Sequence, residues 1–287
     1  MRDFIIVSDS ATDLSAEMTQ KLGIKSISME VVLDGGDPVL GDRIDTKAFY
    51  ADLRAKKNAT TSAINLDRFL TFFESLLQED TDLLYLGFSS GLSGTYQASV
   101  LALQELSEKY PDRKLYAVDT LCASMGQGLL VYHAAKQREN GADIDAVRDF
   151  VEQNKLNLCH WFTVDDLFFL KRGGRVSAAT AVVGTMLSIK PVLHVDNAGK
   201  LINVAKARGR KAAIDTLFEK MKATYFPDRN NVIFISHGDC ETDASYLADR
   251  IRDELGVSNI EINFIGPVIG AHSGPGTLAL FFLGSER

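Results

Sequence analysis

The first half of the chain alternates short apolar runs with longer segments of helical periodicity. The apolar runs are FIIVSDS, KSISMEVVL, DLLYLGF and KLYAVDT, and the amphipathic segments between them include LDRFLTFFESLLQ and GTYQASVLALQELSEKY. Regular alternation of strand and helix gives a mainly parallel sheet with helices on both faces. We therefore expect an α/β unit that binds its ligand at the carboxyl ends of its strands.

The pattern changes after residue 157. PVLHVDNAGKLINVAKA predicts a hairpin around the turn DNAGK, and the later runs predict strands and helices of a mixed sheet. A chain of 287 residues is long for one core, because domains usually have about 100 to 200 residues. We expect two domains, residues 1–157 with the parallel sheet and residues 158–287 with a mixed α/β arrangement.

Composition narrows the classes of function. The net charge of −7 and the pI near 5.3 argue against a general nucleic-acid-binding protein, which needs a basic face. Cys122, Cys159 and Cys240 lack the spacing of a metal site or a disulfide framework, so we expect reduced thiols and no metal. The start MRDFIIVSDS predicts a first strand rather than a signal peptide, and a cytoplasmic protein is expected.

The segment GFSSGLSGTY follows the apolar run DLLYL and allows three interpretations. Its G-x-S-x-G pattern predicts a nucleophile elbow at Ser89, and His237 or His272 could complete a serine esterase. Against the esterase, no HGGG-type segment supplies an oxyanion hole, and several serines crowd the nucleophile. Alternatively, Ser93 caps the following helix, or it helps a helix N-terminus to accept an anion.

A second hydroxyl cluster favours the anion site. NATTSAIN places Thr60, Thr61 and Ser62 just before an amphipathic helix, where they cap that helix or face the strand ends. In the second case their hydroxyls meet Ser93 and His272 around one small carboxylate, to which they give hydrogen bonds without a full opposing charge. Neither G-x-x-x-x-G-K-[ST] nor G-x-G-x-x-G after the first strand is present, so nothing in the sequence supports nucleotide binding.

Two basic segments stand out in this acidic chain. FLKRGGRVS carries Lys171, Arg172 and Arg175, and KARGRK carries Arg208 among its four cations. Such segments are either solvated faces or surfaces that bind phosphate or a protein partner.

Many of these segments occur together, in the same order, in a known family. The chain resembles the DegV family of bacterial fatty-acid-binding proteins, which includes the FakB subunits of fatty acid kinase. The resemblance runs nearly end to end and rests on IIVSDSATDLS, TTS, SSGLSGTYQAS, FLKRGGRVS, KPVLHVDNAGK, ISHGD and GPVIGAHSGPGTLALFF. It implies a two-domain α/β protein that holds one long-chain fatty acid, with residues 158–287 closing the acyl pocket.

The resemblance also implies roles for single residues. The carboxylate is expected to bind Thr61 and Ser93, with His272 nearby and Ser62 and Gly94 adjacent. Arg172 or Arg175 is expected to engage a DAK-like fatty acid kinase subunit, and Arg208 is predicted to join this docking surface. One departure concerns Ala63-Ile64, which replaces the Gln-Pro common after Thr-Ser in relatives and affects the headgroup geometry.

These expectations predict a carrier rather than an enzyme. The protein would present the acyl carboxylate to a separate ATP-dependent kinase, which forms acyl phosphate for phospholipid synthesis, with transient contact to a membrane. Burying roughly 14 to 17 methylene groups at about 0.8 kcal/mol each gives more than 10 kcal/mol gross, so the headgroup site supplies orientation more than affinity. The alternatives are the Ser89 esterase and a lipid-binding sensor or store without a kinase partner.

Overall fold

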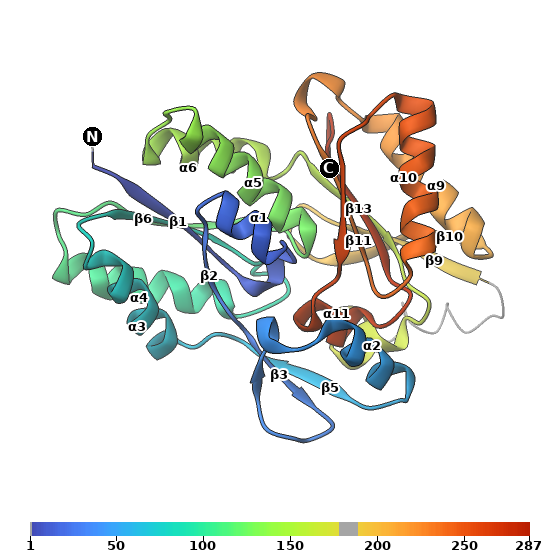
Figure 1. The fold of residues 1–287 in the computed structure, drawn as a ribbon, viewed down its shortest axis with the longest axis horizontal. Helices are drawn as coiled ribbons and strands as arrows, with labels where there is room; N and C mark the ends of the chain where they lie inside the picture. Colours follow the sequence, from blue (N-terminus) through green and yellow to red (C-terminus); the bar gives the residue numbers. More distant parts are fainter. Residues whose placement is uncertain (1, 178–188) are drawn as a thin grey trace.

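A computed structural model describes residues 2–177 and 189–287 and contains the predicted parallel sheet (Figure 1). Its strand order is β2-β1-β6-β7, and every neighbouring pair is parallel. Helices α3 and α4 cover one face and α5 and α6 the other, as predicted. The elements of this unit are β1 (Phe4–Asp9), α1 (Ala16–Lys21), β2 (Lys25–Ile27), α3 (Leu66–Leu77), β6 (Asp82–Gly87), α4 (Thr95–Lys109), β7 (Leu115–Asp119), α5 (Met125–Glu139) and α6 (Ile144–Asn154).

The sequence predicted a single strand for the segment KSISMEVVL, and this prediction is wrong. The segment divides into β2 and β3, and β3 joins β4 and β5 in a separate antiparallel sheet. The triplet Thr60, Thr61 and Ser62 lies on β5, so these residues do not cap α3, whose cap is Asn65. The elements of this region are η1 (Ser10–Thr12), β3 (Glu30–Leu33), β4 (Val39–Leu40), η2 (Gly41–Arg43), α2 (Thr46–Arg54) and β5 (Ala59–Ser62).

The second half forms the expected mixed sheet, in the order β10-β9-β8-β13-β11-β12. The predicted hairpin is present as the antiparallel pair β9 and β10, and β11 runs parallel to β12. Helices α9 and α10 pack on one face of this sheet. The elements are β8 (Leu158–Thr163), α7 (Phe168–Arg172), β9 (Ile189–Val195), β10 (Leu201–Arg208), α9 (Arg210–Thr224), η4 (Pro227–Arg229), β11 (Ile233–His237), α10 (Glu241–Leu255), β12 (Ile260–Phe264), α11 (Pro267–Ser273) and β13 (Leu278–Leu283).

Helix α5 lies between the two large sheets. It packs on β6 from one side and on β8, β11 and β13 from the other, and nearly all of its first eleven residues are buried. Apart from Gln127 and His133 these buried residues are apolar or glycine, as expected for a helix that is covered on both sides. Two glycines permit the close contact: a Cβ at Gly126 would lie 2.2 Å from Nε2 of His160, and one at Gly128 would lie 2.7 Å from the carbonyl oxygen of Thr12.

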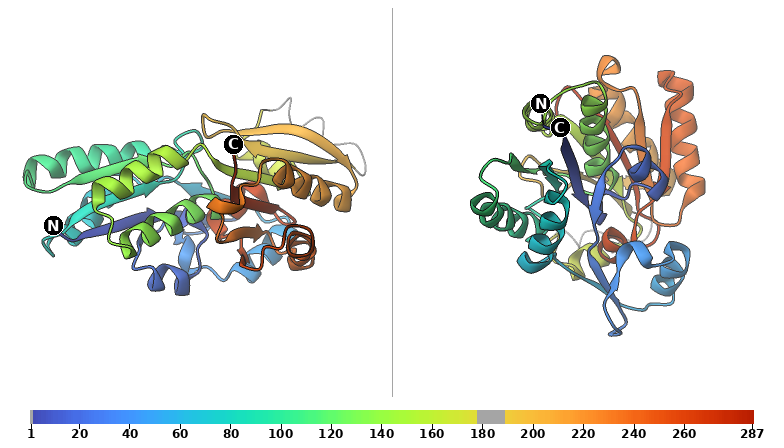
Figure 2. Two further views of the ribbon diagram at one scale, coloured as in Figure 1. Left: turned by 90° about the horizontal axis from the view of Figure 1, so that it is seen from above. Right: turned by 60° about the vertical axis from the view of Figure 1, so that its left-hand side comes forward.

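The two units are adjacent in space and share one apolar cluster around α5 (Figure 2). Strands of the four-stranded sheet all precede residue 157, and strands of the six-stranded sheet all follow it. We propose residue 157 as the boundary between the units. The small antiparallel sheet belongs to the first half of the chain but packs against the second half. Both β3 and β5 contact α11.

Candidate functional site

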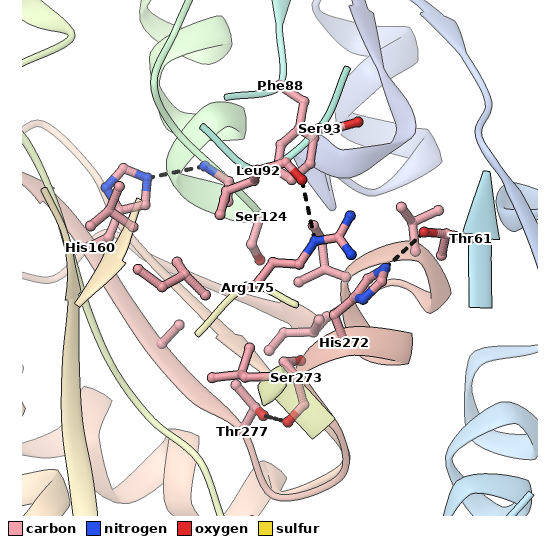
Figure 3. A pocket seen from close by; sticks show the side chains of 18 of the residues that line it. Thr61, Phe88, Leu92, Ser93, Ser124, His160, Arg175, His272, Ser273 and Thr277 are labelled. Atoms are coloured by element: carbon pink, nitrogen blue, oxygen red, sulfur yellow. Dashed lines mark hydrogen bonds between the residues drawn. The ribbon is translucent and has the colours of Figure 1, made fainter. Parts of the chain in front are cut away.

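A cavity of about 390 Å³ lies where the strand-end loops of the first unit meet the second unit. This volume is within the range of about 300 to 1,000 Å³ that is usual for small-molecule sites. All five residues that the sequence predicted to bind ligand line this cavity. They are Thr61, Ser62, Ser93, Gly94 and His272. Figure 3 labels Thr61, Ser93 and His272 among them.

Thr61 and His272 form a hydrogen-bonded pair at one side of the cavity. Oγ1 of Thr61, on β5, lies 2.8 Å from Nε2 of His272, in the last turn of α11. Burial lowers the pKa of His272 to about 4, with help from the charges of Arg175 and Arg172. The imidazole is therefore neutral near pH 7, and its Nε2 can donate to Thr61 while the Thr61 hydroxyl donates to an anion.

Gly173, the first glycine of FLKRGGRVS, explains how His272 is held. A Cβ at Gly173 would lie 2.3 Å from Nδ1 of His272, so only glycine allows the imidazole to pack against this backbone. The φ of Gly173 is −71°, an ordinary value, and the requirement is therefore space rather than conformational freedom.

Ser93 is held by the first turn of α4. Its Oγ accepts the N–H of Thr95 at 3.2 Å and lies 2.9 Å from Oγ1 of Thr95. The N-cap position is Gly94 and not Ser93, which corrects the capping prediction. Oγ1 of Thr95 also accepts the N–H of Ile64 at 3.3 Å. This bond connects the loop after β5 to the start of α4.

Arg175 lines the cavity and is half-buried, although the sequence predicted it only as a docking residue. Its Nε donates to the carbonyl oxygen of Leu92 at 3.3 Å (Figure 3). Nη1 donates to the carbonyl oxygen of Gly173. Burial lowers the pKa of the guanidinium. Even a lowered arginine pKa leaves a cation at pH 7, so the cavity offers a positive charge beside its hydroxyls.

The other two predicted docking residues are exposed. Arg172 donates to Oδ1 of Asn58 and lies 4.9 Å from the ring centre of Phe169, and Arg208 is the last residue of β10. A docking role for these arginines stays a prediction.

Ser89 does not have the surroundings of a nucleophile. Its side chain is fully buried, its Oγ donates to the carbonyl oxygen of Gly199 at 2.8 Å, and the same atom accepts the N–H of Gly91 at 3.2 Å. Within residues 2–177 and 189–287, neither His237 nor His272 bonds to Ser89, because His237 accepts the N–H of Cys240 and His272 pairs with Thr61. Through its hydrogen bond to Gly199, Ser89 instead connects its loop to the turn between β9 and β10.

The remainder of the cavity wall is largely apolar, contributed by β8, β13, α11 and neighbouring loops. Sequence reasoning missed four polar members, Ser124, His160, Ser273 and Thr277. Ser124 belongs to VDTLCAS, one of the polar loops at the strand ends, so its position was a usable signal. No sequence signal marked His160 as a site residue, because it lies inside the buried run LCHWFT. The large apolar members are Met29, Phe88, Leu92, Phe162, Leu170, Val195, Leu201, Ile265, Val268, Ile269 and Phe281.

Among the described residues, histidine, cysteine, aspartate and glutamate side chains do not gather in any group of three that would hold a metal ion. In the same part of the chain, none of the helices combines the length and the apolar character needed to cross a bilayer.

The family is established by comparison with known proteins. A family model described as "Uncharacterised protein, DegV family" matches residues 3–285. A DegV domain-containing protein of Clostridium perfringens is 46% identical over 100% of this chain and 99% of its own. The chain belongs to the DegV family.

Solved structures share its fold. A DegV lipid binding protein from Thermotoga maritima matches with a TM-score of 0.85 and 31% identity, over 99% of both chains. A structure of a DegV family protein from Thermus thermophilus, described by its fatty acid binding, matches with a TM-score of 0.87 and 30% identity, over 99% of this chain and 100% of that one. The mixed α/β architecture predicted from the sequence is confirmed.

The pKa of His272 provides a test of the site's electrostatics. We expect Arg175→Gln to raise this pKa above about 4, because the variant removes the cation that most strongly disfavours the imidazolium. Heteronuclear NMR of the imidazole nitrogens during a pH titration measures the change. Arg208→Gln, at an exposed position, serves as the control and should leave the midpoint in place. Equal midpoints in the wild type and Arg175→Gln would contradict this assignment.

Proposed function

We propose that this protein binds one long-chain fatty acid, with the acyl chain in the apolar part of the cavity and the carboxylate at Thr61, Ser93 and Arg175. The observation that carries the proposal is the distribution of polarity within one cavity: hydroxyls, a neutral imidazole and a half-buried guanidinium lie beside a largely apolar wall. A molecule with one anionic end and a long apolar body fits that distribution. The fatty acid and lipid binding described for the two solved relatives supports the same ligand class.

The headgroup site holds the carboxylate with little direct charge pairing. Arg175 already donates to the carbonyl oxygens of Leu92 and Gly173, so part of its donor capacity is used by the protein. The hydroxyls of Thr61 and Ser93 complete the carboxylate's hydrogen bonds, and His272 fixes the orientation of Thr61. This arrangement leaves electron density on the carboxylate oxygens, which suits a group that later acts as a nucleophile.

The second part of the proposal concerns what happens to the bound ligand. The protein catalyses nothing alone; a separate DAK-like kinase subunit transfers phosphate from ATP to the carboxylate, and the acyl phosphate enters phospholipid synthesis. The exposed arginines Arg172 and Arg208 provide cations for docking on a chain whose net charge is −7. The alternative role as a sensor or store uses the same ligand without the kinase.

Thr61→Val tests the headgroup assignment. The substitution keeps the shape of the side chain and removes its hydroxyl, so we expect oleic acid to bind roughly 10-fold or more weakly, as for loss of a hydrogen bond to a charged group. Titration of delipidated protein by calorimetry measures the change. Thr216→Val, whose hydroxyl bonds within α9, is the matched control and should bind as the wild type does. An unchanged affinity in Thr61→Val would contradict the assignment.

The kinase step has its own test. Arg172→Glu should lower acyl phosphate formation by a fatty acid kinase subunit and ATP at least several-fold, because reversing a charge at a docking surface slows association. Hydroxylamine trapping quantifies the acyl phosphate, and oleic acid binding should stay unchanged. Arg252→Glu, on the exposed side of α10, is the control. Equal rates in wild type and Arg172→Glu would remove Arg172 from the docking surface, and a wild type that binds oleic acid but is never phosphorylated would favour the sensor or store.

A further inference from the structure

A buried carboxyl group lies directly behind the cavity wall. Asp13 follows β1 and η1, and only 6% of its surface is exposed. Oδ1 accepts the N–H of Gly266 at 2.9 Å, and Oδ2 lies 2.5 Å from Oγ of Ser124. Gly266 begins α11, the helix that carries His272, while Ser124 lines the cavity at the start of α5. Asp13 therefore joins two elements that form the cavity.

The backbone at this junction is strained. Ser124 has φ 53° and ψ −148°, a combination that is nearly restricted to glycine. Its hydroxyl bonds to Asp13 and lies 3.0 Å from Oγ of Ser236. A Cβ at Gly266 would lie 2.7 Å from Oδ1 of Asp13, so the packing leaves no room around the carboxyl group. Strain of this kind persists where the surroundings enforce it, and here Asp13 is one of the enforcing groups.

The charge of Asp13 has little compensation. Burial raises the pKa of its carboxyl group to about 7, and the negative charge of Asp9 adds to the increase. Among the described residues that shift this pKa, none is a cation. The polar and titratable groups that face Asp13 are Asp9 of β1, Tyr50 of α2, Ser124 of α5, Asn263 of β12 and the N–H of Gly266.

We propose that Asp13 is a positioning residue of the cavity and that ligand binding is coupled to its proton. The carboxyl group of Asp13 accepts from both Ser124 and Gly266, which holds the starts of α5 and α11 together. Ionisation places an uncompensated charge behind the wall, where it repels the ligand carboxylate. The ligand therefore binds best to the protonated form, and binding takes up a proton. This inference rests on the proposed fatty acid function and adds its regulation by pH.

The effect on stability has a definite sign. The folded-state pKa of Asp13, about 7, lies above its ordinary value of 3.8. The contribution of Asp13 to stability is therefore complete below the unfolded pKa and is lost as the pH rises through the folded pKa. Ligand affinity should likewise fall as the pH rises through the folded-state pKa of Asp13, about 7.

The test compares oleic acid affinity in the wild type and Asp13→Asn across about pH 6 to 9. The amide resembles the neutral acid, and the ratio of the two affinities cancels the titration of oleic acid and of His272. We expect a constant ratio at the acidic end, with the wild type weakening relative to Asp13→Asn by up to about tenfold per pH unit above the midpoint. Asp67→Asn, exposed in the first turn of α3, should follow the wild type. A ratio that is flat across this range would overturn the inference.

A second variant carries the test where Asp13→Asn does not fold. Ser124→Gly relieves the strain, keeps Asp13 and removes a hydrogen bond that lowers the pKa of Asp13. The midpoint of the pH effect should therefore move to higher pH, and an unmoved midpoint would argue against Asp13. Failure of the wild type to bind oleic acid at any pH would instead contradict the proposed function. Binding with a ratio of wild-type to Asp13→Asn affinity that does not change with pH would contradict only the role of Asp13.

Discussion

Helix α5 is buried between the two large sheets, and this packing determines where the ligand cavity forms. A helix that packs on β6 from one side and on β13 from the other fixes the position of one sheet relative to the other. The carboxyl ends of the parallel strands then face the second unit, and the cavity forms where they meet. The glycines at 126 and 128 set how closely the helix approaches its neighbours. The ligand site is thus a consequence of one shared core.

The surroundings of the headgroup site are largely apolar, and hydrogen bonds are stronger there than in water. Burial keeps His272 neutral, so its pairing with Thr61 is a hydrogen bond without formal charge. Arg175 is the cation of the cavity wall, held partly by backbone carbonyl oxygens. In the proposed complex, apolar burial supplies retention, and these three residues set the direction in which the carboxylate points. The proposed role of presenting the ligand to a kinase requires both properties.

Much of the fold and the site was predictable from the sequence. Strand-helix alternation gave the parallel sheet, and the polar strand-end loops contained Ser93 and Ser124. The small antiparallel sheet was not predicted, because the break after β2 interrupts a run whose composition favours strand throughout. The position of Arg175 was also missed. Its segment indicates a cation, whereas the direction of the side chain depends on contacts with Leu92 and Gly173.

We propose that the cavity holds one fatty acid, and organic extraction of the purified protein, followed by mass spectrometry of the extract and quantification against protein, tests this. We expect close to one equivalent of long-chain fatty acid per chain, and its length and unsaturation would define the acyl preference. A protein that releases no fatty acid and takes up none when oleic acid is added would refute fatty acid binding.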